Sequence, residues 1–166
     1  MCNTPRGALE DTVGNPLYSE GIKQLRAGNL ENAQRLVEQA KRQGDASVEE
    51  LRDMAYGLDE HGERDLATEL LREALRQEPS AAEPACALAM YLLEKQEDEQ
   101  AAAVLKPALA AAPDHPKANL CMAMALAKTE AARARTHAAR AMKAPDADVR
   151  AQAEALDKVL AQHEPR

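Results

Sequence analysis

Small residues recur every 34 positions through most of this 166-residue chain. Three successive sets share this shift, namely Gly28, Ala33 and Ala40, then Gly62, Ala67 and Ala74, then Gln96, Ala101 and Ala108. A second series with the same spacing consists of Gly21, Ala55, Ala89 and Ala123. A unit of this length is one supersecondary element that buries its apolar face only by stacking on its neighbours. The spacing therefore predicts a continuous stacked core.

A pair of antiparallel helices explains the residue type at each recurring position. A small residue in the middle of the first helix and another in the second helix let the two helices approach closely. Gly28 and Gly62 end the first helix with a positive φ, and Pro79 and Pro113 end the second helix. We therefore expect each unit to be a helix-turn-helix pair.

Capping motifs agree with these boundaries. Asn15-Pro16 supplies an N-cap and a proline at the first helical position. Ser47-Val-Glu-Glu50 and Ser80-Ala-Ala-Glu83 have the pattern of capping boxes. We expect helices to begin at all three places.

Composition fits a soluble all-helical chain. The sequence is 45% hydrophobic and 30% charged, it is rich in alanine, and it has no Trp or Phe. Its net charge of −7 argues against a nucleic-acid partner, because the phosphate backbone needs a basic surface. The longest apolar run, Ala85 to Leu93, is far shorter than the roughly 20 residues that span a membrane. These features predict a cytoplasmic protein.

The three cysteines leave a second localisation open. An odd number of cysteines in a chain without an apolar leader favours free thiols. However, Cys2 directly follows the initiator Met. It could be the acylated residue of a periplasmic lipoprotein whose signal peptide was replaced.

The 34-residue pattern resembles the tetratricopeptide repeat (TPR) family, in which a small residue, a Gly, two Ala and a Pro recur at these positions. The resemblance covers residues 14–47, 48–81 and 82–115, and a degenerate fourth repeat covers 116–146. It implies an all-α, right-handed solenoid, formed by one domain over 14–163 with a capping helix at 147–163, after a flexible arm at 1–13. The family's Trp is absent, and Lys41 and Asp45 stand where the first repeat would have Leu and Pro.

The resemblance also implies a concave groove, lined by the first helix of each repeat, that holds a peptide. The matching positions that we expect to form it are Tyr18, Ile22, Leu25, Arg26, Arg52, Tyr56, Cys86, Met90, Leu93, Leu120, Met124 and Lys128. An apolar floor with a charged rim suits an amphipathic helix or an extended apolar segment. The alternative is that some of these residues pack under the N-terminal arm or between helices.

Other kinds of site have weaker support in the sequence. Some TPR proteins bind acidic C-terminal tails through a clamp of Lys, Asn and Arg. This clamp is absent here, since the acidic residues Asp53 and Glu83 occupy two of its positions. No His pairs with another His or Cys at helical spacing, so we expect no catalytic site, metal or cofactor.

Two further groups of side chains leave alternatives open. Arg133, His137 and Arg140 share one face of a helix, which either contacts an acidic partner or is an ordinary solvated surface. Cys86 and Cys121 fall on neighbouring inner helices, about 10 Å apart at corresponding positions, which is too far for a disulfide. We expect each of them to be a small buried hydrophobic residue.

The functional prediction is a non-enzymatic binding module that acts as a chaperone or assembly adaptor. In size it is similar to small bacterial TPR adaptors, such as the chaperones of type III secretion translocators, and a secretion or pilus-type system fits it. The alternative is a self-assembling scaffold subunit, a homo-oligomer anchored to a membrane through Cys2.

Overall fold

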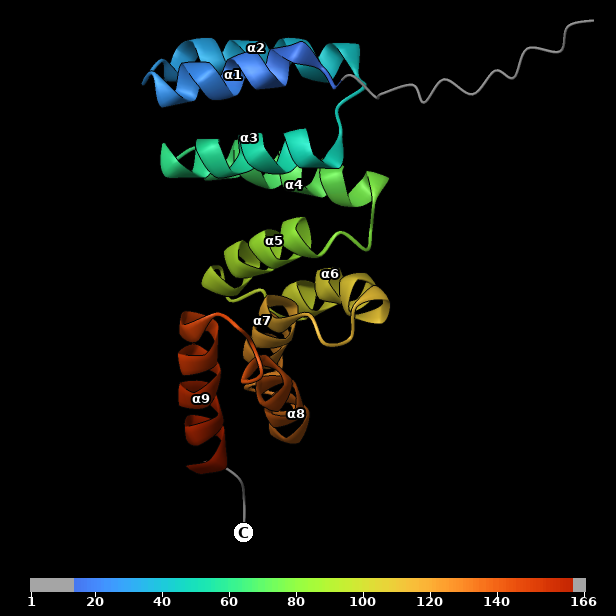
Figure 1. Ribbon diagram of the computed structural model, residues 1–166, viewed down its shortest axis with the longest axis vertical. Helices are drawn as coiled ribbons and strands as arrows, with labels where there is room; N and C mark the ends of the chain where they lie inside the picture. The colour runs from blue at the N-terminus through green and yellow to red at the C-terminus, as the bar shows by residue number, and fades with distance from the viewer. Residues whose placement is uncertain (1–13, 163–166) are drawn as a thin grey trace, which may run out of the picture.

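The computed structural model describes residues 14–162, and within them it has nine α-helices and no strand. The helices are α1 (Pro16–Arg26), α2 (Leu30–Gln43), α3 (Val48–Glu60), α4 (Arg64–Gln77), α5 (Ala82–Glu94), α6 (Asp98–Ala111), α7 (Pro116–Leu126), α8 (Ala131–Ala141) and α9 (Ala147–Gln162). They stack along the long axis of the molecule, from α1 and α2 at one end to α9 near the other (Figure 1). The predicted all-α solenoid is confirmed. The predicted arm at 1–13, with Cys2, lies outside the described residues, as does residue 163.

Recurring alanines lie where paired helices are closest. Each second helix has, in its first half, an alanine with no exposed surface, and these four residues are Ala33, Ala67, Ala101 and Ala134. The first helices contribute Ala55, Ala89 and Ala123, which are buried to the same degree. A residue without a bulky side chain lets two helix backbones approach closely. The 34-residue spacing therefore reflects packing within each helix pair.

The turn inside each of the first three pairs has the same geometry. Gly28 and Gly62 adopt the predicted positive φ, 78° and 83°, and Gln96 adopts 61° at the equivalent position. In each turn the next amide donates back to a carbonyl in the last turn of the helix, as in Glu97 N to Leu92 O at 2.8 Å. Gln96 thus keeps a glycine conformation although it has a side chain.

Replacing Gln96 with glycine is expected to raise the free energy of unfolding by about 0.5–1 kcal/mol, because glycine reaches a positive φ without steric cost. Urea denaturation followed by circular dichroism measures the change. The matched control is Gln100→Gly, an exposed position inside α6, where glycine is expected to destabilise by a similar amount. If both substitutions destabilised the protein, the conformational explanation for Gln96 would be wrong.

Two of the three predicted caps are confirmed. Asn15 caps α1 by accepting from the Leu17 amide at 3.0 Å, and Ser47 and Glu50 form a complete capping box at the start of α3. The capping box predicted at Ser80 is wrong, because α5 begins at Ala82 and its N-cap, Ala81, makes no side-chain bond. Ser80 instead lies in a turn in which the Ala81 amide donates to the carbonyl of Glu78.

Successive repeats do not stack in the same way. The first repeat contacts the second through α1 and α3, whereas α2 does not pack closely against α4 (Figure 1). The linker after α2 contains two successive positive φ angles, 75° at Gly44 and 62° at Asp45. Later repeats also pack the second helix of one pair on the first helix of the next, α4 on α5 and α6 on α7, and the first helices α5 and α7 contact each other as well. The unusual linker therefore accompanies an opening between α2 and α4.

Helix α9 ends the described stack by packing on α7 and α8. Its predicted apolar stripe is directed inward, with Val149, Ala153 and Leu160 buried and Leu156 packed against them. Within residues 14–162, no helix combines the length and apolar character that crossing a membrane requires.

Candidate binding groove

Two adjoining cavities open on the face formed by the first helices. One has a volume of about 390 Å³ and lies between α1 and α3, where Ile22 and Arg26 line it. The other has a volume of about 550 Å³ and lies among α3, α5 and the start of α7 and of α9. Asp53 and Tyr56 line both cavities. Together the two cavities form a groove, and Tyr56 is the ridge between its halves.

Two exposed large apolar side chains lie on the first helices, and one of them lines the groove. Among the described residues, three large hydrophobic side chains are exposed: Tyr56 at 40%, Met90 at 37% and Val159, which lies on α9. Met90 lies one turn after Cys86 on α5, and Cys86 lines the larger cavity. Tyr56 thus places an aromatic ring between the two cavities, whereas Met90 lines neither cavity and is exposed further along α5.

An ion-pair network crosses the larger cavity. Arg52 on α3 donates to the Asp53 carboxylate at 2.8 Å and to the Glu83 carboxylate of α5 at 2.6 Å. Lys117, at the start of α7, adds a second cation to the wall. Burial, followed by the nearby Glu83 charge, raises the pKa of Tyr56, so its hydroxyl stays protonated at neutral pH. The groove therefore offers an apolar ridge, a hydroxyl donor and charges of both signs.

Three residues predicted on the exposed groove floor are instead core residues. Tyr18 and Leu25 are only 1% and 2% exposed, because α1 packs directly against α3, although Leu25 still borders the smaller cavity. Leu120 is 6% exposed, because α9 covers this face of α7 and places Val149 and Ala153 beside it. The expectation that these three side chains form an open surface is corrected by the close packing of α1 on α3 and of α9 on α7.

The remaining predicted residues are distributed along the groove and its edges. Ile22, Arg52, Leu93 and Met124 are half-buried, and Met124 packs beside α9. Arg26 is exposed and lines the smaller cavity, whereas Lys128 lies at the edge, where its ammonium pairs with Asp98 at 2.8 Å. A peptide-binding role for these residues stays a prediction.

The two inner-helix cysteines are buried, as expected. Cys86 lies on α5 and Cys121 on α7, two helices that pack against each other, and both thiols are free. Cys121 follows Cys86 by 35 residues, one more than the repeat, and one residue turns a helical side chain by about 100°. The two cysteines are therefore not at corresponding positions of their repeats.

The pKa values of the two thiols shift in opposite directions. Interaction with the Cys121 thiol, followed by burial, raises the pKa of Cys86. Interaction with the Cys86 thiol lowers the pKa of Cys121, and the Lys117 charge acts in the same direction.

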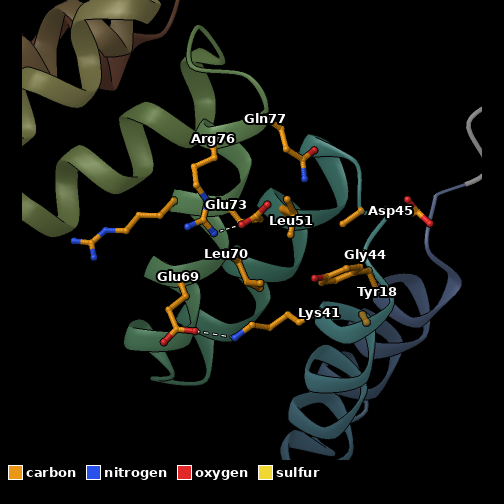
Figure 2. A pocket seen from close by; sticks show the side chains of 13 residues that line it. Tyr18, Lys41, Gly44, Asp45, Leu51, Glu69, Leu70, Glu73, Arg76 and Gln77 are labelled. Carbon is orange, nitrogen blue, oxygen red and sulfur yellow. Dashed lines mark hydrogen bonds and ion pairs between the residues drawn. The ribbon is translucent and has the colours of Figure 1, made fainter.

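A third cavity, which the sequence interpretation missed, lies between α2 and α4 (Figure 2). Its volume is about 540 Å³, and Tyr18, Leu51 and Leu70 are among its apolar lining residues. Lys41 pairs with Glu69 across it at 2.9 Å (Figure 2). Lys41 and Asp45, the two departures from the repeat pattern, both line this cavity. Those departures were the available sequence signal.

The predicted basic face of α8 is not a uniform surface. Arg133 pairs with Glu130 at 2.5 Å and Arg140 is exposed. The His137 ring is directed inward, and its Nδ1 donates to the Asn119 side-chain oxygen at 2.8 Å. Burial, followed by Arg140 and Arg133, lowers the pKa of His137. Within residues 14–162 no three His, Cys, Asp or Glu side chains are arranged to hold a metal ion.

Comparison with known proteins gives a fold likeness and no sequence family. No family model matches the chain, and no curated protein sequence does. Residues 41 to the end of MamA from Desulfovibrio magneticus RS-1 superpose with a TM-score of 0.64 at 20% identity, covering 94% of this chain and 93% of that one. MamA from AMB-1 gives a TM-score of 0.62 at 20% identity, covering 89% and 82%. MamA is a TPR protein, and this chain has the same kind of fold, a solenoid of TPR-type helix pairs.

Proposed function

We propose that this chain is a non-enzymatic protein-binding module that holds an apolar or amphipathic segment of a partner protein against α1, α3 and α5. The observation that carries the proposal is the position of Tyr56, which is 40% exposed and lines both groove cavities. An exposed tyrosine ring between two cavities suits a binding anchor, since hot spots are enriched in tyrosine and cluster in well-packed pockets that a partner desolvates.

The shape of the groove suits a short segment with two apolar side chains. Cavities of about 390 and 550 Å³ lie on either side of Tyr56, so one side chain can enter each. An amphipathic helix presents such anchors three, four or seven positions apart. Arg52, Asp53 and Glu83 would then contact the polar side of the same segment. A chaperone or assembly adaptor for a secretion or pilus-type system is one role that such binding would serve.

The test uses peptides selected on the wild-type protein by phage display and then measured by fluorescence polarisation. Tyr56→Glu and Met90→Glu are each expected to weaken binding of the selected peptides about tenfold or more, a loss of about 1.4 kcal/mol. Both side chains are already exposed, so the far-UV circular dichroism and the melting temperature are expected to stay close to those of the wild type.

The matched control is Val159→Glu, which places the same charge on an exposed apolar position of α9, outside the groove. It is expected to leave peptide affinity unchanged. Peptides that bind the two groove variants as tightly as the wild type would rule out the proposed site. If only Val159→Glu changed the behaviour, by abolishing self-association in light scattering, the self-assembling scaffold would be the better description.

A further inference from the structure

A further cavity, which the proposed groove does not include, is bordered by α4, α5 and α6. Its volume is about 500 Å³. Leu88 and Leu92 of α5, which are 2% and 4% exposed, are its most deeply buried lining residues. Leu75 of α4 and Val104 of α6 line it as well and are half-buried. Four aliphatic side chains therefore offer an apolar surface to one side chain of a partner.

The charged residues of this cavity are all basic. Arg72 and Arg76 of α4 line it, and Gln100 is the remaining polar residue among the described residues that do so. Both arginines are exposed, and both also line the cavity between α2 and α4. In a chain with a net charge of −7, two guanidinium groups thus border an apolar cavity that is lined by no carboxylate of the described residues.

The repeat explains why no carboxylate lies across from these arginines. At the cavity between α2 and α4, Lys41 of α2 pairs with Glu69 of α4 at 2.9 Å. The positions 34 residues later are those of Leu75 and Ala103. The ion pair that joins α2 to α4 is therefore replaced by two apolar residues on α4 and α6.

Neither arginine is held by an acidic residue of another helix. Arg76 pairs with Glu73, one turn earlier on α4, and 72% of its side chain is exposed (Figure 2). Arg72 forms no ion pair with another described residue. An exposed pair within one helix contributes little to stability, because water screens it. Both guanidinium groups can therefore bind a carboxylate that arrives from outside.

We propose that this cavity and its two arginines form a second docking surface, separate from the groove, for an acidic amphipathic segment of a partner protein. An aliphatic side chain of the segment enters the cavity and contacts Leu88 and Leu92. Carboxylates three or four positions away pair with Arg72 and Arg76, since the planar guanidinium group can donate to both oxygens of a carboxylate. An amphipathic helix presents an apolar and an acidic side chain at this spacing.

The test uses the full chain with Tyr56→Glu, which weakens the groove and leaves the second surface unchanged. Peptides are selected on this protein from a random dodecapeptide phage library and then measured by fluorescence polarisation. They are expected to combine Asp or Glu with Leu, Ile or Phe, three or four positions apart. Arg72→Glu and Arg76→Glu, added singly, are each expected to weaken binding about tenfold or more, because each reverses a charge that contacts the segment.

The matched control is Arg42→Glu. Arg42 is exposed on α2 at the repeat position of Arg76, but it lines neither cavity that Arg76 borders. Its replacement is expected to leave affinity unchanged. All three arginines are exposed, so the melting temperature is expected to stay close to that of the parent protein. A selected peptide whose acidic residues are replaced with lysine is expected to prefer the Arg72→Glu protein to its parent.

Three results would overturn the proposal. They are the selection of no peptide or of peptides without an excess of acidic residues, equal losses for Arg42→Glu and Arg76→Glu, and self-association in sedimentation velocity that Arg72→Glu abolishes. The last result would mean that a second copy of this chain occupies the surface. Peptides that bind only when Tyr56 is intact would support the groove and count against the second surface, so the two proposals can fail separately.

Discussion

Replacing Asn119 with alanine is expected to lower the free energy of unfolding by about 2–4 kcal/mol. Asn119 has no exposed surface, and its amide nitrogen donates to the carbonyls of Pro113 and His115 at 2.8 and 3.0 Å. Its oxygen accepts from His137 at 2.8 Å. Alanine would leave buried polar groups on the linker before α7 and on α8 without that partner, and each such group is costly in the interior.

Urea denaturation measures the loss, with Asn32→Ala as the control. Asn32 is exposed on α2, so the same substitution there is expected to change stability by about 0.5 kcal/mol or less. A double-mutant cycle with His137→Ala isolates the bond between the two side chains, and a coupling of about 0.5–3 kcal/mol is expected for residues in one network. Equal losses for Asn119→Ala and Asn32→Ala would mean that the network does not stabilise the fold.

Asn119 shows which part of the structure the sequence could not predict. It stands at the repeat position of Leu51 and Ala85, so the 34-residue register suggests an ordinary apolar contact there. Its partner His137 lies 18 residues away on α8, on a helix face that seemed to be basic and exposed. Only the packing of α8 on α7 brings the two together. A buried polar pair of this kind produces no repeating pattern in the sequence.

The helix pairs were predictable because their signals are local. Gly28 and Gly62 need only their own φ angles to mark a turn, and Ser47 with Glu50 caps α3 within one turn of helix. The groove was predictable only in part. Exposure of Tyr56 and Met90 follows from their repeat positions, whereas burial of Tyr18 depends on how closely one repeat stacks on the next.

The stacking of one repeat on the next depends on the backbone geometry of the linker between them. The sequence pattern does not fix this geometry. The linkers 44–47, 78–81 and 112–115 have equal lengths. Only the first has positive φ angles among the described residues, at Gly44 and Asp45. The same linker borders the cavity between α2 and α4. Asp45 in place of the usual proline signalled a departure at this point, but its conformation could not be derived from the residue type.

The recurring alanines lead to a second large effect. Replacing Ala101 with leucine is expected to lower the free energy of unfolding by about 1–3 kcal/mol, because it forces extra methyl groups into a filled core. Ala101 has no exposed surface and lies where α6 packs on α5. Leucine is nearly as good a helix former as alanine, so any loss measured by urea denaturation reports packing rather than helix propensity.

Ala103→Leu is the matched control, since Ala103 lies two residues further along the same helix and is exposed. It is expected to change stability by about 0.5 kcal/mol or less. An effect at Ala101 as small as the one at Ala103 would show that α6 can move away from α5 at little cost. The alanine at this repeat position would then not be required for close packing. A loss confined to Ala101→Leu means that alanine recurs every 34 residues because the helix backbones pack closely at these positions.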